Sequence, residues 1–429
     1  HISHLNKFDC DRIAWEQREV GDLLIERSQQ APMSDEYPLM AFIANEGVAP
    51  KGERYDRSAL VTDTVNKLYK KTEKGDFIYS SNNLETGSIG LNKYGKACIS
   101  PVYSIFEPTG IADSDFLGRR LVRKDFINAM VKWRQGVIYG QWRIHESDFL
   151  KIEITVPSVE EQRKIGTYLD QLDHLITLHQ RKFEKLTNVK KSMLEKMFPQ
   201  NGSSYPEIRF KGFTDPWEQR KLTEFVESFS GLTYTPNDVQ ENGTLVLRSS
   251  NVSNGEVVDA DNVYVNPQVV NSENVKVGDI VVVVRNGSRS LIGKHAQIKA
   301  FMPNTVIGAF MTGIRSECPE FTNALLNTSR FEEEIAMNMG ATINQITGYM
   351  FSKMEFKVPC LDEQKKIGEY FEKLDRLVTL HQRKFEKLTN VKKSMLEKMF
   401  PQNGSSYPEI RFKGFTDPWE QRKLTEFVE

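Results

Sequence analysis

Polar residues gather in one turn in the second half of the chain, directly after an apolar run. The turn has the sequence RNGSR over residues 285–289, and a lysine follows at position 294. Arginine and asparagine carry the donor and acceptor groups that match guanine and adenine edges in the major groove of DNA. The glycine allows the backbone to approach a ligand closely. The candidate DNA-contacting residues of this half are Arg285, Asn286, Ser288, Arg289 and Lys294.

The first half contains a similar polar turn over residues 80–83, after a short β-rich run, and a compact basic cluster over residues 119–124. Each feature alone is more typical of a solvated turn or helix face. Their recurrence in two related halves is what favours a binding role. The candidate DNA-contacting residues of this half are Ser80, Asn82, Asn83, Arg119, Arg120 and Arg143.

Two short segments resemble catalytic signatures, but each has a simpler explanation. Asp215-Pro216-Trp217 shares part of an amino-methyltransferase signature, yet it lacks the second proline and is better explained as a turn before a packed tryptophan. Glu355 and Lys357 have the spacing of a metal nuclease, but alternation along a strand places both on one solvated face. No GxxxxGK[ST] phosphate loop is present, and the seven histidines do not cluster at metal-ligand spacing. We therefore expect a chain that is not an enzyme and binds no metal or cofactor.

Composition limits how nucleic acid could be bound. The chain has 429 residues, 39% of them apolar, and a net charge of -1. Residues 19–156 hold 18 Lys and Arg against 19 Asp and Glu, and residues 228–357 hold 10 against 13. Any DNA binding must therefore rely on local clusters or on basic partners. The four cysteines show no CxxC spacing, and no signal or membrane-spanning pattern is seen, so a reduced, cytoplasmic protein is expected.

The elements that position these turns come from an internal repeat. Residues 177–227 recur letter for letter as residues 379–429, at an offset of 202, and a diverged match continues upstream. Each copy contains a long helical pattern, from Ser158 to Phe198 in the first, with apolar residues in steps of three and four that form a heptad-like seam. Such a helix spans about 60 Å. Ser158 and Glu161 fit a capping box, and Cys360 in place of Ser158 should weaken the second cap.

The two helices are expected to pair antiparallel about a pseudo-twofold axis, because their seams are nearly identical. His179 interrupts the first seam near its midpoint, as His381 does in the second, so we expect the two histidines to lie close together. A polar seam pair that fixes the helix register is favoured over a metal pair. The predicted seam residues are Leu172, His179, Leu186, Leu374, His381 and Leu388.

The remaining pattern predicts an α+β fold. It has short strands, of which residues 279–284 are the clearest, a hairpin turn at Asn286-Gly287, and a helix over residues 319–339. The repeated tail is expected to dock where the first half needs an opening segment. The predicted domains are residues 1–156 and 217–357 for two recognition domains, 157–200 and 358–400 for the long helices, 201–216 for a linker and 401–429 for the tail.

Taken together, the chain resembles the specificity subunits of type I restriction-modification systems along essentially its full length. The resemblance depends on the two halves joined by repeated helices and on several short motifs. These are VPSVEEQRKI at residues 156–165, VPCLDEQKKI at 358–367, EIRF at 207–210, WEQR at 217–220, GDFIY at 75–79 and GDIV at 278–281. In contrast to the usual pattern, the PEIRF lead stands at the carboxyl end and not at the amino end.

The resemblance implies two target-recognition domains, each reading one half of a bipartite double-stranded DNA site, with the paired helices setting the gap. It also implies docking of two methyltransferase subunits that methylate adenine, and of motor-nuclease (restriction) subunits that use ATP, while this chain is non-catalytic. A methylation-only complex without motor subunits stays open. The alternative from another class is a coiled-coil scaffold or adaptor that binds proteins only.

Overall fold

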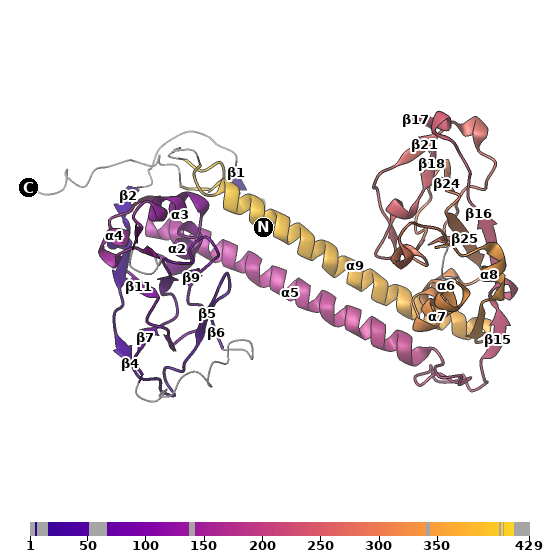
Figure 1. The fold of residues 1–429 in the computed structure, drawn as a ribbon, viewed down its shortest axis with the longest axis horizontal. Helices are drawn as coiled ribbons and strands as arrows, with labels where there is room; N and C mark the ends of the chain where they lie inside the picture. The colour runs from indigo at the N-terminus through magenta and orange to yellow at the C-terminus, as the bar shows by residue number, and fades with distance from the viewer. Residues whose placement is uncertain are drawn as a thin grey trace, which may run out of the picture. The chain divides into compact units, whose positions relative to one another are not determined.

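The computed structural model describes residues 5–6, 16–50, 67–136, 142–339, 344–402, 405 and 407–415. Cys10, one of the four cysteines, and the tail beyond residue 415 lie outside these residues. The chain divides into two compact units (Figure 1). Unit 1 comprises His1–Leu178 and Lys384–Glu429, and unit 2 comprises His179–Arg383.

Unit 1 is built on a four-stranded antiparallel sheet with the strand order β3-β11-β8-β9, and a second sheet has the order β10-β7-β4. Its helices before the long one are α1 (Val20–Leu23), α2 (Ser114–Arg120), α3 (Lys124–Val131) and α4 (Glu146–Leu150). Its strands are β1 (Leu5–Asn6), β2 (Glu16–Glu19), β3 (Leu24–Glu26), β4 (Gln30–Ala31), β5 (Ala41–Ile43), β6 (Gly47–Ala49), β7 (Tyr69–Thr72), β8 (Phe77–Tyr79), β9 (Ile89–Leu91), β10 (Ala97–Ile99), β11 (Ser104–Pro108), β12 (Gln135–Gly136), β13 (Trp142–Arg143), β14 (Glu153–Val156) and β27 (Arg411–Phe412).

Unit 2 repeats this plan with the strand order β16-β25-β22-β23, and adds a second four-stranded sheet of order β17-β21-β18-β24. Its short helices are α6 (Pro319–Leu326), α7 (Ser329–Asn338) and α8 (Gly348–Lys353). Its strands are β15 (Glu218–Lys221), β16 (Val226–Ser230), β17 (Val239–Gln240), β18 (Thr244–Leu247), β19 (Val252–Ser253), β20 (Glu256–Val257), β21 (Val263–Val265), β22 (Ile280–Val283), β23 (His295–Gln297), β24 (Thr305–Ile307), β25 (Met311–Ser316) and β26 (Glu355–Val358).

A buried aspartate opens the central strand of each unit. Asp76 and Asp279 are each 1% exposed, and each follows a glycine with a positive φ, +96° at Gly75 and +95° at Gly278. The Asp76 carboxylate accepts a hydrogen bond from the Glu73 backbone N–H at 2.7 Å, and Asp279 accepts one from its own turn in the same way. Burial raises the pKa of Asp76, whereas Arg27 at 3.0 Å opposes that change. In both units the aspartate of the Gly-Asp motif therefore stabilises the turn that precedes the central strand.

Two long helices run through both units: α5 (Val159–Met197) and α9 (Leu361–Lys398). In each unit the start of one helix lies beside the end of the other, and the two run in opposite directions (Figure 1). In unit 1, Leu172 of α5 lies in a core against which Leu388 of α9 packs. In unit 2, Leu374 of α9 lies in a core against which Leu186 of α5 packs.

Paired charges repeat the same antiparallel arrangement. Lys392 pairs with Asp173 in unit 1. The residues 202 positions away, Lys190 and Asp375, pair at 2.6 Å in unit 2. The long helices therefore make equivalent contacts in the two units.

The histidines meet as expected. The Nδ1 atoms of His179 and His381 are 2.8 Å apart, and the ring centroids are 5.1 Å apart. At that separation one ring nitrogen donates a hydrogen bond and the other accepts it. Among the described residues, no group of three or more His, Cys, Asp or Glu side chains could hold a metal ion. The geometry is that of a polar contact within the seam.

The glutamate of each EQ motif is buried at the start of a long helix. Glu363 is fully buried, and its carboxylate accepts hydrogen bonds from Nε and Nη2 of Arg209 at 2.7 Å. The Glu161 carboxylate likewise accepts from Nε and Nη2 of Arg411 at 2.8 Å. The predicted capping box at Ser158 is therefore only half formed, because the Glu161 carboxylate pairs with Arg411. The Ser158 hydroxyl still accepts from the Glu161 N–H at 3.4 Å.

The described part of the repeated tail docks on unit 1 as its first copy docks in unit 2. Phe412 packs edge-on against Tyr168, and Phe210 packs in the same way against Tyr370. In addition, β27 pairs with β1. The described part of the tail therefore packs within unit 1, whereas the rest of the tail, which repeats the opening of the second half, lies outside the described residues.

A glycine at the same place in each long helix lets a short helix approach. A Cβ on Gly166 would lie 2.5 Å from the Asp113 carboxylate, and one on Gly368 would lie 2.8 Å from the Phe321 backbone nitrogen. Asp113 is the N-cap of α2, and its side chain accepts from the Phe116 N–H at 2.9 Å. The glycines thus bring a short helix of each unit, α2 or α6, close to its long helix.

Two expectations about local structure were wrong. The helix predicted over residues 319–339 is broken between α6 and α7, where the Thr328 hydroxyl donates to the Leu325 carbonyl at 2.6 Å. Asn286-Gly287 is not a two-residue hairpin turn, because β22 and β23 are joined by the longer loop 284–294 and neither residue has a positive φ.

Candidate nucleic-acid interface

In unit 2 the predicted polar turn lies where β22 ends, and its backbone is anchored on both sides. The N–H groups of Val284 and Arg285 both donate to the Phe310 carbonyl, at 3.0 and 3.1 Å. The Ile346 N–H donates to the Val284 carbonyl at 2.8 Å, and Arg285 forms an isolated bridge with Gln345. Three separate segments therefore meet at this loop.

Asn286 braces the loop from within. Its side-chain oxygen accepts from the Ser288 N–H at 3.0 Å, and its amide nitrogen donates to the Ser249 hydroxyl at 3.0 Å. Asn344 donates to the Gly287 carbonyl at 3.1 Å. Because its polar atoms are already engaged, Asn286 is better suited to hold the loop than to contact a ligand. The Ser288 hydroxyl is exposed and lies 2.9 Å from that of Ser290.

The positively charged side chains of this loop differ from the other arginines of residues 217–357 in that they have no carboxylate partner among the described residues. Arg248, Arg315 and Arg330 each pair with a carboxylate. Arg285, Arg289 and Lys294 are exposed, and none has a carboxylate within ion-pair distance among the described residues. Cations without internal partners are available to an external anion such as a DNA phosphate.

Exposed aromatic residues accompany this loop, and the sequence alone did not single them out. Phe310 is 53% exposed at the turn before β25, and Tyr349 is 72% exposed on α8. The Arg285 guanidinium carbon lies 4.9 Å from the centroid of the Phe310 ring. The sequence carried only a weak signal, an aromatic residue in the Gly308-Ala309-Phe310 turn, because single exposed apolar side chains are common on protein surfaces.

In unit 1 the loop after β8 is braced in a comparable way. The Asn82 side-chain oxygen accepts from the Trp142 N–H at 2.7 Å, and the Ser81 hydroxyl accepts from the Ile144 N–H at 3.1 Å. Ser80 is buried, whereas Asn83 is exposed. Ser80 and Asn82 therefore serve the loop structure, and Asn83 keeps an exposed side chain. Arg143 is exposed and lies 3.8 Å from Glu146.

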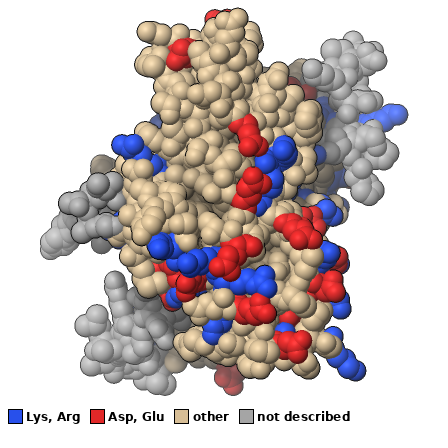
Figure 2. All heavy atoms as spheres, turned by 90° about the vertical axis from the view of Figure 1, so that its right-hand side faces the viewer, with Lys and Arg blue, Asp and Glu red and all other residues tan. Residues whose placement is uncertain are grey.

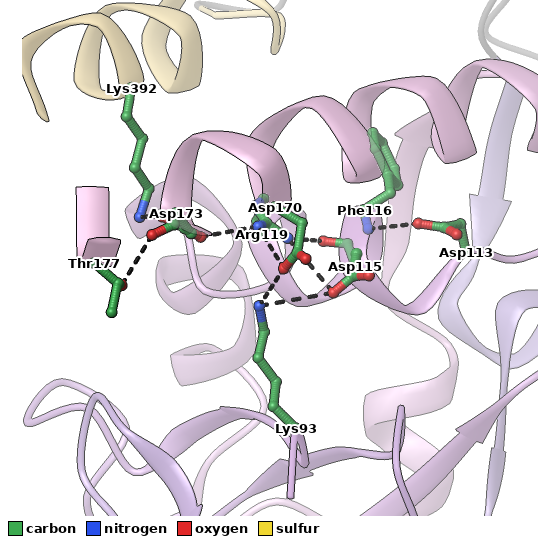
Figure 3. A network of polar contacts seen from close by, with 9 residues as sticks. All are labelled: Lys93, Asp113, Asp115, Phe116, Arg119, Asp170, Asp173, Thr177 and Lys392. Atoms are coloured by element: carbon green, nitrogen blue, oxygen red, sulfur yellow. Dashed lines mark hydrogen bonds and ion pairs between the residues drawn. The ribbon is translucent and has the colours of Figure 1, made fainter. Parts of the chain in front are cut away.

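Arg119 occupies a different place from the one expected of a DNA contact. It is 9% exposed, and it pairs with Asp173 at 3.0 Å and with Asp170 at 3.6 Å, both on α5 (Figure 3). Lys93 joins the same network through Asp170 at 3.0 Å. Arg119 therefore attaches α2 to the long helix, and it is removed from the DNA-contacting candidates because its charge is internally neutralised.

Arg120 is also engaged, because it pairs with Asp125 at 2.8 Å and its side chain is only 14% exposed. The basic cluster over residues 119–124 is thus largely internal. Within the described residues of unit 1, the candidate interface is therefore limited to the loop after β8 and the segment that hydrogen-bonds with it. Trp142 belongs to that segment and is 51% exposed, and the sequence alone did not indicate it.

The two loops are equivalent in position but not in chemistry. Asn82 lies six residues after Asp76, as Arg285 does after Asp279. At the neighbouring turn, Val102 is 69% exposed in unit 1, where Phe310 stands in unit 2. The same corner of the framework therefore presents different side chains in each unit.

No broad basic surface appears on the face of unit 2 drawn in Figure 2. Blue and red side chains alternate over its lower part, and the upper part, over β17, β18, β21 and β24, carries few charges. This agrees with the balanced charge of the sequence. Within the described part of the chain, no helix is both long and apolar enough to cross a membrane.

The minor nuclease alternative finds no support in the geometry. The Lys357 ammonium donates to the Ser203 carbonyl at 2.7 Å, and the Glu355 carboxylate accepts from Gln219. Both side chains therefore serve contacts within unit 2.

A family model and individual relatives that match this chain all belong to the same kind of protein. A family model described as "Type I restriction modification DNA specificity domain" matches residues 13–188 and again residues 214–390. The type I restriction enzyme MjaVIII specificity subunit of Methanocaldococcus jannaschii is 24% identical over 403 residues, covering 89% of this chain and 91% of its own. The EcoKI specificity subunit of Escherichia coli is 28% identical over 187 residues, covering 41% of this chain and 40% of its own.

Among solved structures, the S subunit of a type I restriction-modification system from M. genitalium is similar with a TM-score of 0.59. The sequence identity is 14%, and the match covers 93% of this chain and 99% of that one. At this identity the likeness concerns the fold alone.

Proposed function

This chain belongs to the type I restriction-modification DNA specificity family, and on that premise we propose that its two units read the two halves of one bipartite DNA site. It is a specificity subunit, and the scaffold alternative is not favoured. The protein acts with DNA and with other subunits of its complex. Unit 1 would read one half-site through the loop after β8, and unit 2 would read the other through the loop after β22.

The main observation behind this proposal is that the two units share one fold but expose different side chains at equivalent positions. The Gly-Asp turns, the sheet order and the helix contacts recur in both units, whereas the exposed residues at the equivalent corners differ. A chain that only connected other proteins would not need two different surfaces at equivalent places. Different side chains at an interface with base edges select different bases.

The long helices would act as the spacer that fixes the gap between the half-sites. Their antiparallel contacts recur in both units as the ion pairs of Lys392 and of Lys190, and His179 meets His381 at the seam. A spacer of this kind holds two readers at a defined separation. The length of the unspecified gap would then depend on the number of helical residues.

Exposed leucines on these helices support the docking of two partner subunits. Leu175 and Leu178 in unit 1 are 40% and 37% exposed, and Leu377 and Leu380 in unit 2 are 43% and 45% exposed. Apolar side chains that form an exposed patch are typical of protein contacts, and these leucines recur in both units. We assign the two places to two methyltransferase subunits. Motor-nuclease subunits would join that complex, and partner subunits would add phosphate contacts to the few that this near-neutral chain supplies.

The test is to express the chain with its cognate methyltransferase subunit and map methylated adenines across a genome. The expected result is a split motif of two short defined halves separated by a fixed gap. Replacing residues 217–357 by the corresponding segment of a relative should change only one half. A stable complex that methylates no defined sequence would overturn the proposal and favour the scaffold alternative.

A further inference from the structure

One cation in the loop of unit 2 is held against an aromatic ring. Arg285 lies over the exposed Phe310 ring, with its guanidinium carbon 4.9 Å from the ring centroid. A cation–π contact of this kind restricts the position of the guanidinium and uses none of its N–H donors. Arg289 in the same loop has no such aromatic support among the described residues.

The backbone beneath Arg285 and Phe310 is also fixed. The Phe310 carbonyl accepts from the Arg285 N–H itself, so the two side chains in contact come from directly hydrogen-bonded residues. Asn286 and Asn344 brace the following residues, as described above. A side chain restrained by both a cation–π contact and a fixed backbone loses less conformational entropy when it binds.

Arg285 also has no competing partner. No carboxylate among the described residues lies within ion-pair distance of it, whereas Arg248, directly after β18, pairs with Asp261. The free edge of a planar guanidinium presents two parallel donors. These match the O6 and N7 acceptors of guanine in the major groove.

From these contacts we infer that Arg285, oriented by Phe310, reads a guanine in the half-site of unit 2. Arg289 and Lys294 then contact the DNA backbone, because neither is held in a fixed orientation. The inference rests on the proposed function and adds a specific base and a specific residue to it. Unit 1 cannot read a guanine in the same way, since Asn82 and Val102 stand at the equivalent positions.

The experiment measures adenine methylation rates of the complex on synthetic duplexes that carry the mapped motif. Each base pair of the half-site assigned to unit 2 is replaced in turn. In the unsubstituted complex, replacing the G·C pair read by Arg285 should lower the rate roughly 10- to 100-fold. In Arg285→Ala that penalty should largely disappear at this one position and persist at the others.

Matched variants separate base reading from general attraction. Arg285→Lys keeps the charge but loses the double donor, so it should retain DNA binding and lose the discrimination. Phe310→Leu should weaken discrimination at the same position only. Arg289→Ala should weaken binding to all sequences by a similar factor and reduce the salt dependence.

The outcomes are distinct from those that test the proposed function. A split motif whose unit 2 half contains no G·C pair, or an Arg285→Ala complex that keeps every base preference, would overturn the inference while leaving two readers in place. If Arg285→Ala does not form a stable complex, Arg285→Lys decides between the two results. Complex formation is checked by co-purification and thermal unfolding.

Discussion

Units 1 and 2 use the same framework but attach their recognition domains to the long helices differently. In unit 1, Arg119 and Lys93 bind Asp170 and Asp173 of α5 (Figure 3). In unit 2, Glu256 binds Arg383 of α9 at 2.9 Å, and the residue equivalent to Asp170, Glu372, pairs with Arg376 on its own helix. The two units therefore share the contacts between the long helices and the contacts of the repeated motifs. The ion pairs that join each domain to a long helix differ between the units.

The contacts that the two units share are best tested at the buried ion pairs of Glu363 and Glu161. Glu363→Gln and Glu161→Gln each leave a mostly buried arginine without its carboxylate, so each should cost about 3 kcal/mol in the free energy of unfolding. Because the contacts are equivalent, the two losses should be similar. Urea unfolding measures them, and a large loss in one unit with none in the other would contradict the equivalence.

The two glycines of the long helices should be sensitive to a single methyl group. Gly368→Ala places a Cβ 2.8 Å from a backbone nitrogen, and Gly166→Ala places one 2.5 Å from a side-chain oxygen. We expect a loss of about 2 kcal/mol for Gly368→Ala and a smaller one for Gly166→Ala, because the side chain can move aside. Gly348→Ala, where the space is open, is the control. Thermal unfolding measures these losses, and equal melting temperatures for all three variants would contradict the prediction.

A smaller difference between the units lies at Lys357, where unit 1 has Thr155. Lys357 holds the linker through Ser203 at 2.7 Å and Ser204 at 3.3 Å. Lys357→Thr should release the linker at a cost of about 1 kcal/mol. Limited proteolysis should then cut residues 201–204 faster, and unchanged cleavage would show that the lysine does not hold the linker. Thr155→Lys serves as the matched variant.

The attachment of unit 1 should depend weakly on acid. The hydrogen bond from Lys93 lowers the pKa of Asp170. Since the folded-state pKa lies below the unfolded value, this contribution is present above about pH 4 and is lost as the pH falls through the lowered pKa. Asp170→Asn should therefore reduce the difference between urea unfolding at pH 7 and at low pH. Glu372→Gln, whose partner is on the same helix, should change the profile less.

The sequence predicted the long helices and the meeting of His179 with His381, because both follow from a repeat and a heptad period. It did not predict that Arg119 is internal, because its partners lie about 50 residues away on α5 and no local pattern links them. The break between α6 and α7 also lacked a glycine or proline signal. A threonine hydroxyl closes that turn instead.

The candidate site was predicted in part. The loop 285–294 was identified from residue types alone, but the bracing role of Asn286 depends on Ser249, which is distant in sequence. Phe310 was missed, since its exposure and its contact with Arg285 appear only in the folded chain. Residue types therefore indicated where the site lies, and three-dimensional contacts indicate which of its residues are available.

The most direct test of two readers on one framework is to give both units the same reader. Residues 18–155 would replace residues 220–357, which keeps the repeated helices and the WEQR register, and the methylated motif would be mapped with the cognate methyltransferase subunit. The account predicts a split motif with two copies of the half-site that unit 1 reads. Retention of the original second half-site would contradict it, because specificity would then lie outside the exchanged domain.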